Sequence, residues 1–276
     1  MPSSSSADTI GLMGIDADRP LTRPGTDVTY VVRRILIVLS PALAAILFGG
    51  LLPSIDLGSS FADAMVRVSD TASWTQLPFL ALVVVLAAVT RPGLSTSRRS
   101  IEAGITIVVM LVVLAGNGLL NEHVVKPAIG VPRPNIVTLA EDGTLGPEIS
   151  TGDDFYATGS KSERRGLLHE RLTPARTPDL SPTVRSHWIH EAGYATPSGH
   201  ATTAVTFATL GVGLGLLWLD GWRRRVLLIA LPAWAVAVAT SRLLIGVHTA
   251  TDVIVGALIG VGWGPVSYTH LRAHET

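Results

Sequence analysis

Three short groups of cationic, imidazole and carboxylate side chains stand out in this sequence, because each lies at the border of an apolar block. Their patterns are K-x6-RP at residues 126–134, PSGH at residues 197–200 and SR-x5-H-x3-D at residues 241–252. Together they supply several cations, two imidazoles and a carboxylate, which are the residue types that suit phosphoryl transfer. The sequence therefore points first to a phosphate site.

The cations would bind the phosphate. Lys126, Arg133 and Arg242 provide three positive charges, and a guanidinium fork matches two phosphate oxygens at once. Ser198 and Gly199 stand where an apolar block begins, so their backbone N–H groups and the helix dipole could hold an anion.

The histidines would carry out the reaction. His248 and Asp252 are four residues apart, which predicts that they share one helical face, where the carboxylate can orient the imidazole for attack on phosphorus. His200 is then a candidate general acid. Taken singly, these residues have simpler explanations, such as interfacial cations or a buried polar pair. Their joint occurrence in this order favours a phosphate site.

The elements that must position these residues are six apolar blocks. They lie at residues 35–54, 74–90, 101–120, 200–219, 226–240 and 243–263. A membrane-spanning helix needs about 20 apolar residues, so the pattern predicts an all-α polytopic bundle of six transmembrane helices. The fifth block is short for a span, and the sixth places Ser241-Arg242 at its start. We expect a membrane domain over 34–263 with an insertion at 135–196.

Arginines between the blocks predict the orientation. They gather before the first block, between the second and third, and between the fourth and fifth. Because basic residues favour the cytoplasmic side, residues 1–33 should form a cytoplasmic tail. All three motifs and the 135–196 insertion should then face the extracytoplasmic side of the plasma membrane.

The composition agrees with a membrane protein. Hydrophobic residues make up 47% of the 276 residues and charged residues only 15%, with a mean hydropathy of +0.44. An ordinary cytosolic enzyme carries about 25% charged residues, although a soluble protein with buried core helices is the alternative. Lys and Arg together number 21, as do Asp and Glu, so nothing suggests a nucleic-acid partner. The chain has no cysteine, which excludes disulfides and a Cys nucleophile.

The three motifs, in this order and at these spacings, resemble the signature of the type 2 phosphatidic acid phosphatase superfamily, the integral-membrane lipid phosphate phosphatases. The resemblance covers residues 100–263 by motif and the first two blocks by topology only. It implies a metal-independent, cofactor-free hydrolase in which His248 forms a phosphohistidine, Asp252 supports it and His200 protonates the leaving group. Lys126, Arg133, Ser198, Gly199, His200 and Arg242 would surround the phosphate.

The resemblance implies a lipid phosphate or diphosphate as substrate. Phosphatidate, phosphatidylglycerophosphate and polyprenyl diphosphate all stay open, because the motifs contact only the phosphate that these lipids share. A lipid or sugar phosphotransferase using the same phosphohistidine is the first rival, and a non-catalytic anion or lipid transporter is a remote second. The soluble vanadium haloperoxidases share the motifs, but six apolar blocks argue against them. The sequence does not specify an oligomeric state.

Several other features receive simpler interpretations. His187 and His190 lack a third ligand for a metal, so we expect a loop that packs at the site mouth. Asn117 and Glu102 should be helix–helix contacts, and Glu122-His123 an exposed helix end. Glycine strings at 211–215 and 256–264 predict close helix packing. The polar tail 264–276 resembles translated adapter sequence, so we expect a foreign or truncated C-terminus and give His270 and His274 no role.

Overall fold

The computed structural model describes residues 28–273, with side chains described for residues 29–263. The expected cytoplasmic tail falls outside this range over residues 1–27, and the side chains of the 264–276 tail also fall outside it. The apolar helices are α1 (Val28–Gly49), α3 (Leu77–Val89), α4 (Thr96–Leu120), α10 (Gly199–Trp218), α11 (Gly221–Leu244) and α12 (Ala250–Ala273). The other helices are α2 (Ser60–Asp70), η1 (Asn121–Val125), α5 (Lys126–Ile129), α6 (Pro134–Glu141), α7 (Gly152–Ala157), α8 (Lys161–Arg171) and α9 (Pro182–His190).

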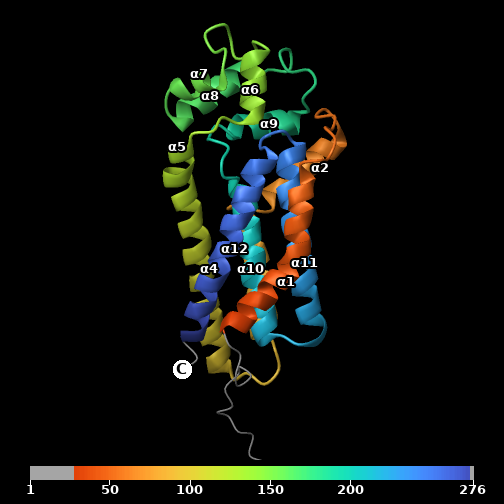
Figure 1. The fold of residues 1–276 in the computed structure, drawn as a ribbon, viewed down its shortest axis with the longest axis vertical. Coiled ribbons are helices and arrows are strands. Elements are labelled where there is room, and N and C mark those ends of the chain that lie inside the picture. Colours follow the sequence, from red (N-terminus) through yellow and green to blue (C-terminus); the bar gives the residue numbers. More distant parts are fainter. Residues whose placement is uncertain (1–27, 274–276) are drawn as a thin grey trace, which may run out of the picture.

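The long helices run side by side along the long axis of the molecule, with α10 at the centre of the bundle (Figure 1). Helix α10 packs against α12, α11, α4, α1 and α3, and 83% of its most apolar window is buried within the protein. The chain therefore folds as the all-α bundle that the apolar blocks predict.

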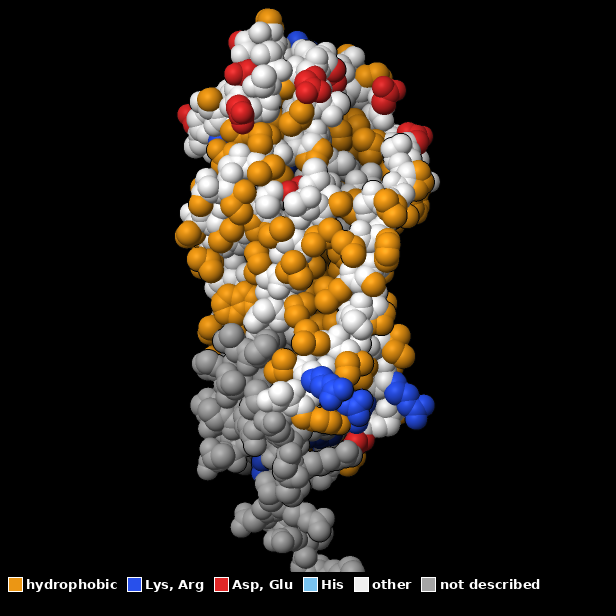
Figure 2. Space-filling view, viewed as in Figure 1, with side chains coloured by type: hydrophobic (Ala, Val, Ile, Leu, Met, Phe, Trp, Pro, Cys, Tyr) orange, Lys and Arg blue, Asp and Glu red, His pale blue; other side chains and the backbone are white. Residues whose placement is uncertain are grey.

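Four helical segments are long and apolar enough to cross a membrane, within the described part of the chain. They are Thr29–Gly49, Thr96–Ile129, Gly199–Trp218 and Gly221–Leu244. The apolar helices Leu77–Val89 and Ala250–Trp263 are shorter than these over their described side chains. Figure 2 shows apolar side chains over the middle of the molecule, acidic side chains at one end and basic side chains near the other. This distribution fits a protein embedded in a bilayer.

Glycines bring α10 into contact with its neighbours, as the glycine strings predict. A Cβ atom on Gly256 would lie 2.7 Å from the Ser198 carbonyl oxygen, and one on Gly260 would lie 2.8 Å from Val205 Cβ. A Cβ on Gly211 would likewise collide with Leu231 of α11. The α10–α12 contact therefore depends on glycines that lack a Cβ atom, and it holds the PSGH segment directly against α12.

Residues 130–198 form a helical cap over one end of the bundle (Figure 1). Side-chain caps begin three of its four helices: Thr151 and Ser160 form capping boxes at α7 and α8, and Ser181 caps α9 ahead of Pro182. An apolar core separate from that of the bundle includes Ile136, Phe155, Leu168 and Trp188 of the cap, and it extends to Val66 of α2. The 135–196 insertion therefore contains helices with a core.

The structure corrects four details of the helix boundaries. The fifth block is not short, since α11 has 24 residues and carries Ser241-Arg242 in its last turn instead of at the start of the sixth helix. His248 lies in the connection before α12, so it does not share a helical face with Asp252. The second block yields only the 13 residues of α3. Lys126 does not follow the third helix, because η1 and α5 continue α4 as far as Ile129.

Candidate active site

All eight residues that the sequence singled out gather where the bundle meets the cap. Five of them line one cavity of about 310 Å³: Lys126, Arg133, Gly199, His200 and His248. Arg242, Asp252 and Ser198 lie buried around it and contact its walls directly or through a neighbouring residue. They come from four different parts of the chain, so the fold assembles what the sequence separates.

Lys126 reaches the cavity from the end of the long α4 segment. The helix widens into a π-helical turn at Asn121–Val125 immediately before Lys126, and it ends at Gly130 in the left-handed region at φ 68°. Such π-helical turns are frequent at functional sites. Lys126 is only 6% exposed, and its ammonium donates to Glu122 at 2.9 Å. A buried cation therefore faces the cavity with one carboxylate partner.

Arg133 and Arg242 are joined by a carboxylate that the sequence analysis missed. Glu191 accepts from Arg133 Nη2 at 2.6 Å through one oxygen and from Arg242 Nη2 at 2.5 Å through the other. Both guanidinium groups are almost completely buried. Burial opposes ionisation of Glu191, but the two arginines outweigh it and hold the pKa of this carboxyl well below its usual range. A carboxylate thus bridges the two cations expected to bind phosphate.

Backbone contacts aim each arginine. Arg133 Nε donates to the Gly193 carbonyl at 2.7 Å, and its Nη1 donates to the Val247 carbonyl at 3.2 Å. Arg242 donates to Ser69 Oγ at 2.6 Å. Arg242 Nε is buried with no hydrogen-bond partner among the described atoms. A buried donor without a partner is available to a ligand oxygen that reaches it.

The PSGH segment is fixed at the start of α10. The Ser198 N–H donates to the Asp252 carbonyl at 2.9 Å, while Ser198 Oγ is buried without a described partner. A Cβ atom on Gly199 would point to within 3.8 Å of Lys126 Nζ. The glycine therefore keeps the space between the helix N-terminus and the ammonium clear, which suits an anion held by both.

The hydrogen bonds of His248 identify its tautomer. Its Nε2 lies 3.0 Å from Arg133 Nη1, and because a guanidinium only donates, Nε2 must accept and carry the lone pair. The proton then belongs on Nδ1, which faces Asp252 Oδ2 at 3.6 Å. This separation exceeds a hydrogen bond, and Nδ1 has no described partner. Burial, reinforced by Arg133 and partly offset by Asp252, lowers the pKa of His248 well below its usual range.

Asp252 is held firmly although His248 is not bonded to it. Thr196 Oγ1 donates to Asp252 Oδ1, and the Thr249 N–H donates to Oδ2 at 2.7 Å. Asp252 in turn donates its N–H to Thr249 Oγ1 at 3.3 Å, which completes a capping box at the start of α12. The carboxylate therefore belongs to the helix cap and lies next to the imidazole.

His200 and His187 face the bridging carboxylate from two sides. His200 Nδ1 is 4.0 Å from Glu191 Oε1, and its side chain is 23% exposed, more than the other site histidine. His187 Nε2 lies 2.8 Å from Arg242 Nη1, so it also accepts from a guanidinium. Burial, with Arg242, lowers the pKa of His187 to about 4. His187 is therefore neutral at pH 7.

The remaining expectations have mixed outcomes. His187 and His190 lie on helix α9 and not in a loop, and the described residues contain no group of three or more His, Asp or Glu side chains that could hold a metal. Glu122 is not a plain exposed helix end, because it contacts both Lys126 and Lys161. Asn117 does make a helix–helix contact, accepting from Trp263 at 3.1 Å.

An apolar cavity adjoins the site between α3 and α4. It has a volume of about 280 Å³, its walls include Leu77, Val85 and Met110, and it shares Trp74 with the site cavity. A Cβ on Gly118 would lie 2.7 Å from Trp74, so this glycine makes room for the indole. The polar site thus has an apolar neighbour on the membrane-facing part of the bundle.

Comparisons with known proteins were consistent with one family. A family model described as the PAP2 superfamily matches residues 106–274. Phosphatidylglycerophosphatase B of Escherichia coli (strain K12) is 38% identical over 155 residues, which is 55% of this chain and 56% of that protein. The protein of the same name from Shigella flexneri gives the same figures. The one from Haemophilus influenzae is 29% identical over 133 residues, or 46% and 50% of the two chains. The chain spans about half the length of these curated relatives.

Proposed function

The chain belongs to the PAP2 superfamily, and on that premise we propose that it is a membrane phosphatase acting on a lipid phosphate or diphosphate. The observation that carries the proposal is that Lys126, Arg133, His200 and His248 line one cavity, with Arg242 joined to it through Glu191. The relatives named phosphatidylglycerophosphatase B support a phospholipid phosphate as the substrate class.

The reacting phosphate would occupy the space between the two arginines and the start of α10. Arg242 Nε and Ser198 Oγ are buried polar atoms without described partners, and a phosphate oxygen would satisfy each of them. Lys126 Nζ and the N-terminal amides of α10 would bind the remaining oxygens. In this state the phosphate shares the arginines with Glu191, or takes its place.

His248 would be the nucleophile. Its Nε2 lone pair attacks phosphorus, an N–P bond forms, and the bond from phosphorus to the lipid oxygen breaks. His200 donates a proton to the departing oxygen. Water then attacks the phosphohistidine, His200 accepts a proton from that water, and the N–P bond breaks to release inorganic phosphate. A neutral imidazole is needed for the first step, and the lowered pKa of His248 provides it. No metal takes part in these steps.

Arg133 would exchange partners during the attack. It contacts Nε2, the attacking atom, at 3.0 Å in the ligand-free protein. When a phosphate oxygen takes this guanidinium hydrogen, the lone pair becomes available to phosphorus. Asp252 lies on the Nδ1 side and stabilises the positive charge that the ring acquires.

The apolar cavity supports a lipid over a soluble phosphate ester. Trp74 lines both this cavity and the site cavity, and the apolar cavity is bounded by α3 and α4. An acyl or prenyl chain held there would leave its phosphate beside Lys126. The proposed orientation follows from a different feature. The cap lies at the end of the bundle opposite the arginine-rich connections, so the active site would face the extracytoplasmic side.

Phosphate release from purified protein tests the proposal. We expect the full chain in detergent micelles to hydrolyse phosphatidate, phosphatidylglycerophosphate or a polyprenyl diphosphate in the presence of EDTA. His248→Ala should lower the rate at least about a thousandfold, whereas His123→Ala, at an exposed histidine, should not. Loss of activity in EDTA, or wild-type activity in His248→Ala, would contradict the mechanism.

A pair of glycine variants tests the lipid cavity. Gly118→Ala would push a methyl group into Trp74, whereas a Cβ on Gly116, two residues earlier, meets no atom within 4 Å. We expect Gly118→Ala to raise KM for long-chain substrates several-fold and to leave water-soluble phosphate esters unaffected. An equal change of KM for both substrate types, or in both variants, would show that this cavity does not bind the apolar chain of the substrate.

A further inference from the structure

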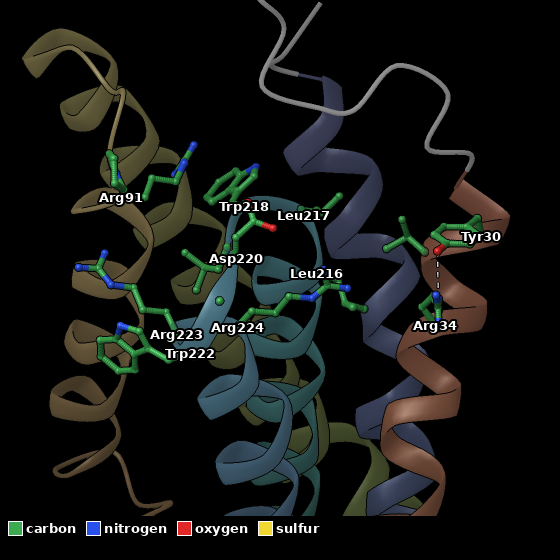
Figure 3. Close-up of a pocket in the computed structure, with 14 residues that line it drawn as sticks. Tyr30, Arg34, Arg91, Leu216, Leu217, Trp218, Asp220, Trp222, Arg223 and Arg224 are labelled. Atoms are coloured by element: carbon green, nitrogen blue, oxygen red, sulfur yellow. Dashed lines mark hydrogen bonds between the residues drawn. The ribbon is translucent and has the colours of Figure 1, made fainter.

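A third cavity lies at the end of the bundle opposite the candidate active site. Its volume is about 790 Å³, against about 310 Å³ for the site cavity. Its walls come from the start of α1, the α3–α4 connection and the turn from α10 into α11. Figure 3 shows Arg34 on one side of it, Arg91 and Trp222 on the other, and Arg224 between them.

Cations dominate the polar lining of this cavity. Among the described residues, four arginines, Arg34, Arg91, Arg223 and Arg224, line it together with one carboxylate, Asp220. Arg91 has a structural role, because it is buried, pairs with Glu102 at 2.7 Å and stacks over Trp218 at 4.9 Å. The cavity is therefore positive even after that pair is set aside.

The other three arginines contact only neutral groups among the described residues. Arg34 contacts the Tyr30 hydroxyl at 3.0 Å and Arg223 donates to Thr90 Oγ1 at 3.2 Å, both neutral oxygens. Within the described residues, no carboxylate lies within 4.0 Å of the guanidinium groups of Arg34, Arg223 or Arg224. A phosphate group matches such donors in charge and in geometry.

The surroundings of the cavity place it at a membrane surface. Tyr30 is 52% exposed and Trp222 is 70% exposed at the ends of apolar helices, as in the aromatic belts of membrane proteins. Leu216 and Leu217 also line the cavity. Exposed apolar side chains continue along the same helices, with Ile37 on α1 and Ile229 on α11. A ligand with a phosphate head group and apolar chains matches a positive cavity that is continuous with apolar helix surfaces.

We propose that this cavity binds the head-group phosphate of an anionic phospholipid in the leaflet on the far side of the membrane from the candidate active site. The head group lies in the cavity among the guanidinium groups of Arg34, Arg223 and Arg224, and the acyl chains lie along the apolar surfaces of α1 and α11. The lipid joins two helices that are distant in sequence, α1 and α11. The proposal does not depend on the phosphatase activity.

Photochemical labelling with site mapping tests the proposal on the full chain. The protein is reconstituted in phosphatidylcholine nanodiscs with a trace of photoactivatable phosphatidylglycerol, and the labelled peptides are identified by mass spectrometry. We expect labelling of residues 216–224, removed by excess unlabelled phosphatidylglycerol but not by inorganic phosphate. A phosphatidylcholine probe should label this segment about tenfold less. Competition by inorganic phosphate would identify a soluble anion as the ligand, and equal labelling by both probes would exclude head-group recognition.

Two double variants separate a site from general surface charge. Arg223→Gln/Arg224→Gln removes two cavity arginines, while Arg33→Gln/Arg225→Gln removes two exposed arginines of the same end that do not line the cavity. We expect about tenfold weaker labelling in the first and little change in the second. Arg34→Gln, on a different helix, should also weaken labelling and covers the case in which the first variant folds poorly. Equal labelling in both double variants would overturn the proposal.

Discussion

Glu191 bridges the two arginines that converge on the site, and its own charge depends on them. Two guanidinium groups that are at most 2% exposed would repel each other without an anion between them, and removing one partner of a buried ion pair costs about 3–5 kcal/mol. In the ligand-free protein Glu191 supplies that anion. In the proposed complex the substrate phosphate supplies the same charge.

We therefore predict that Glu191→Gln lowers the melting temperature of the free protein and makes it more responsive to phosphate. Inorganic phosphate should raise the melting temperature of the variant more than that of the wild type, because it replaces a missing negative charge. Thermal unfolding in detergent with and without phosphate measures both effects. Glu148→Gln, in a cap surface pair with Arg171, is the control and should behave as wild type. Equal phosphate shifts in all three proteins would refute this role.

His187 should make stability depend on pH. Its pKa is about 4 in the folded protein and about 6.5 in an unfolded chain, so between these values only the unfolded chain binds the proton. The free energy of unfolding should therefore fall as the pH is lowered from about 6.5 to about 4, by on the order of 3 kcal/mol in total. As the pH falls through this range, the melting temperature of the wild type should decrease toward that of His187→Gln. The melting temperature of His169→Gln, at an exposed histidine, should follow that of the wild type. A parallel course for His187→Gln would contradict the assignment.

At the scale of elements, the contact between α10 and α12 connects helix packing to the site. The PSGH segment begins α10, and Gly256 of α12 lies against the Ser198 carbonyl. The same Ser198 residue donates its N–H to the Asp252 carbonyl. A displacement of α12 would therefore move both the start of α10, where we propose that the phosphate binds, and the carboxylate of Asp252.

Gly256→Ala should reduce activity far more than the loss of one glycine on a helix would suggest. Its Cβ would lie 2.7 Å from a backbone oxygen, which cannot rotate away, whereas a Cβ on Gly262 of the same helix meets no atom within 4 Å. We expect at least a tenfold loss of kcat/KM for Gly256→Ala, in line with the cost of misplacing catalytic groups by about 1 Å, and near wild-type values for Gly262→Ala. Steady-state kinetics of the two variants decide the point, and similar values would show that the contact does not position the site.

The apolar blocks predicted the existence of the long helices but not where each helix ends. Hydropathy falls at Ser241-Arg242, so the sequence places a boundary there, yet α11 continues through both residues. It can do so because Arg242 meets Glu191, 51 residues earlier in the chain. No local pattern reports such a distant partner. The glycine contacts, by contrast, were predictable, because only small residues allow two helix backbones to approach so closely.

The same reasoning explains which residues of the candidate site could be identified from the sequence. The motif residues were predictable from their types and fixed spacing, and the fold brings them to one place. Glu191 and Thr196 were not, because each is a single polar residue in a polar segment, and only the folded cap brings them to Arg242 and Asp252. Proximity of Glu191 to the PSGH motif was the one signal available.

At the scale of the whole molecule, the two ends of the bundle differ in charge and in shape. The cap end carries acidic side chains, and the other end carries exposed arginines (Figure 2). The positive-inside rule then predicts that the cap is extracytoplasmic. The chain has no cysteine, so single cysteines can report each end without removing native ones.

We predict that Glu170→Cys in the cap reacts with a membrane-impermeant maleimide in intact cells, and that Arg225→Cys reacts only after permeabilisation. Both positions are exposed in the fold. The reverse pattern would place the active site on the cytoplasmic side.

The phosphohistidine is the central claim, and its direct capture is the sharpest test. Protein mixed with a ³²P-labelled lipid phosphate in single-turnover amounts is quenched in alkali within milliseconds, since phosphohistidine survives alkali and is lost in acid. The account predicts label on the peptide that contains His248, present in wild type and in His123→Ala and absent in His248→Ala. Phosphate release at the wild-type rate by His248→Ala, or the same label in that variant, would contradict it.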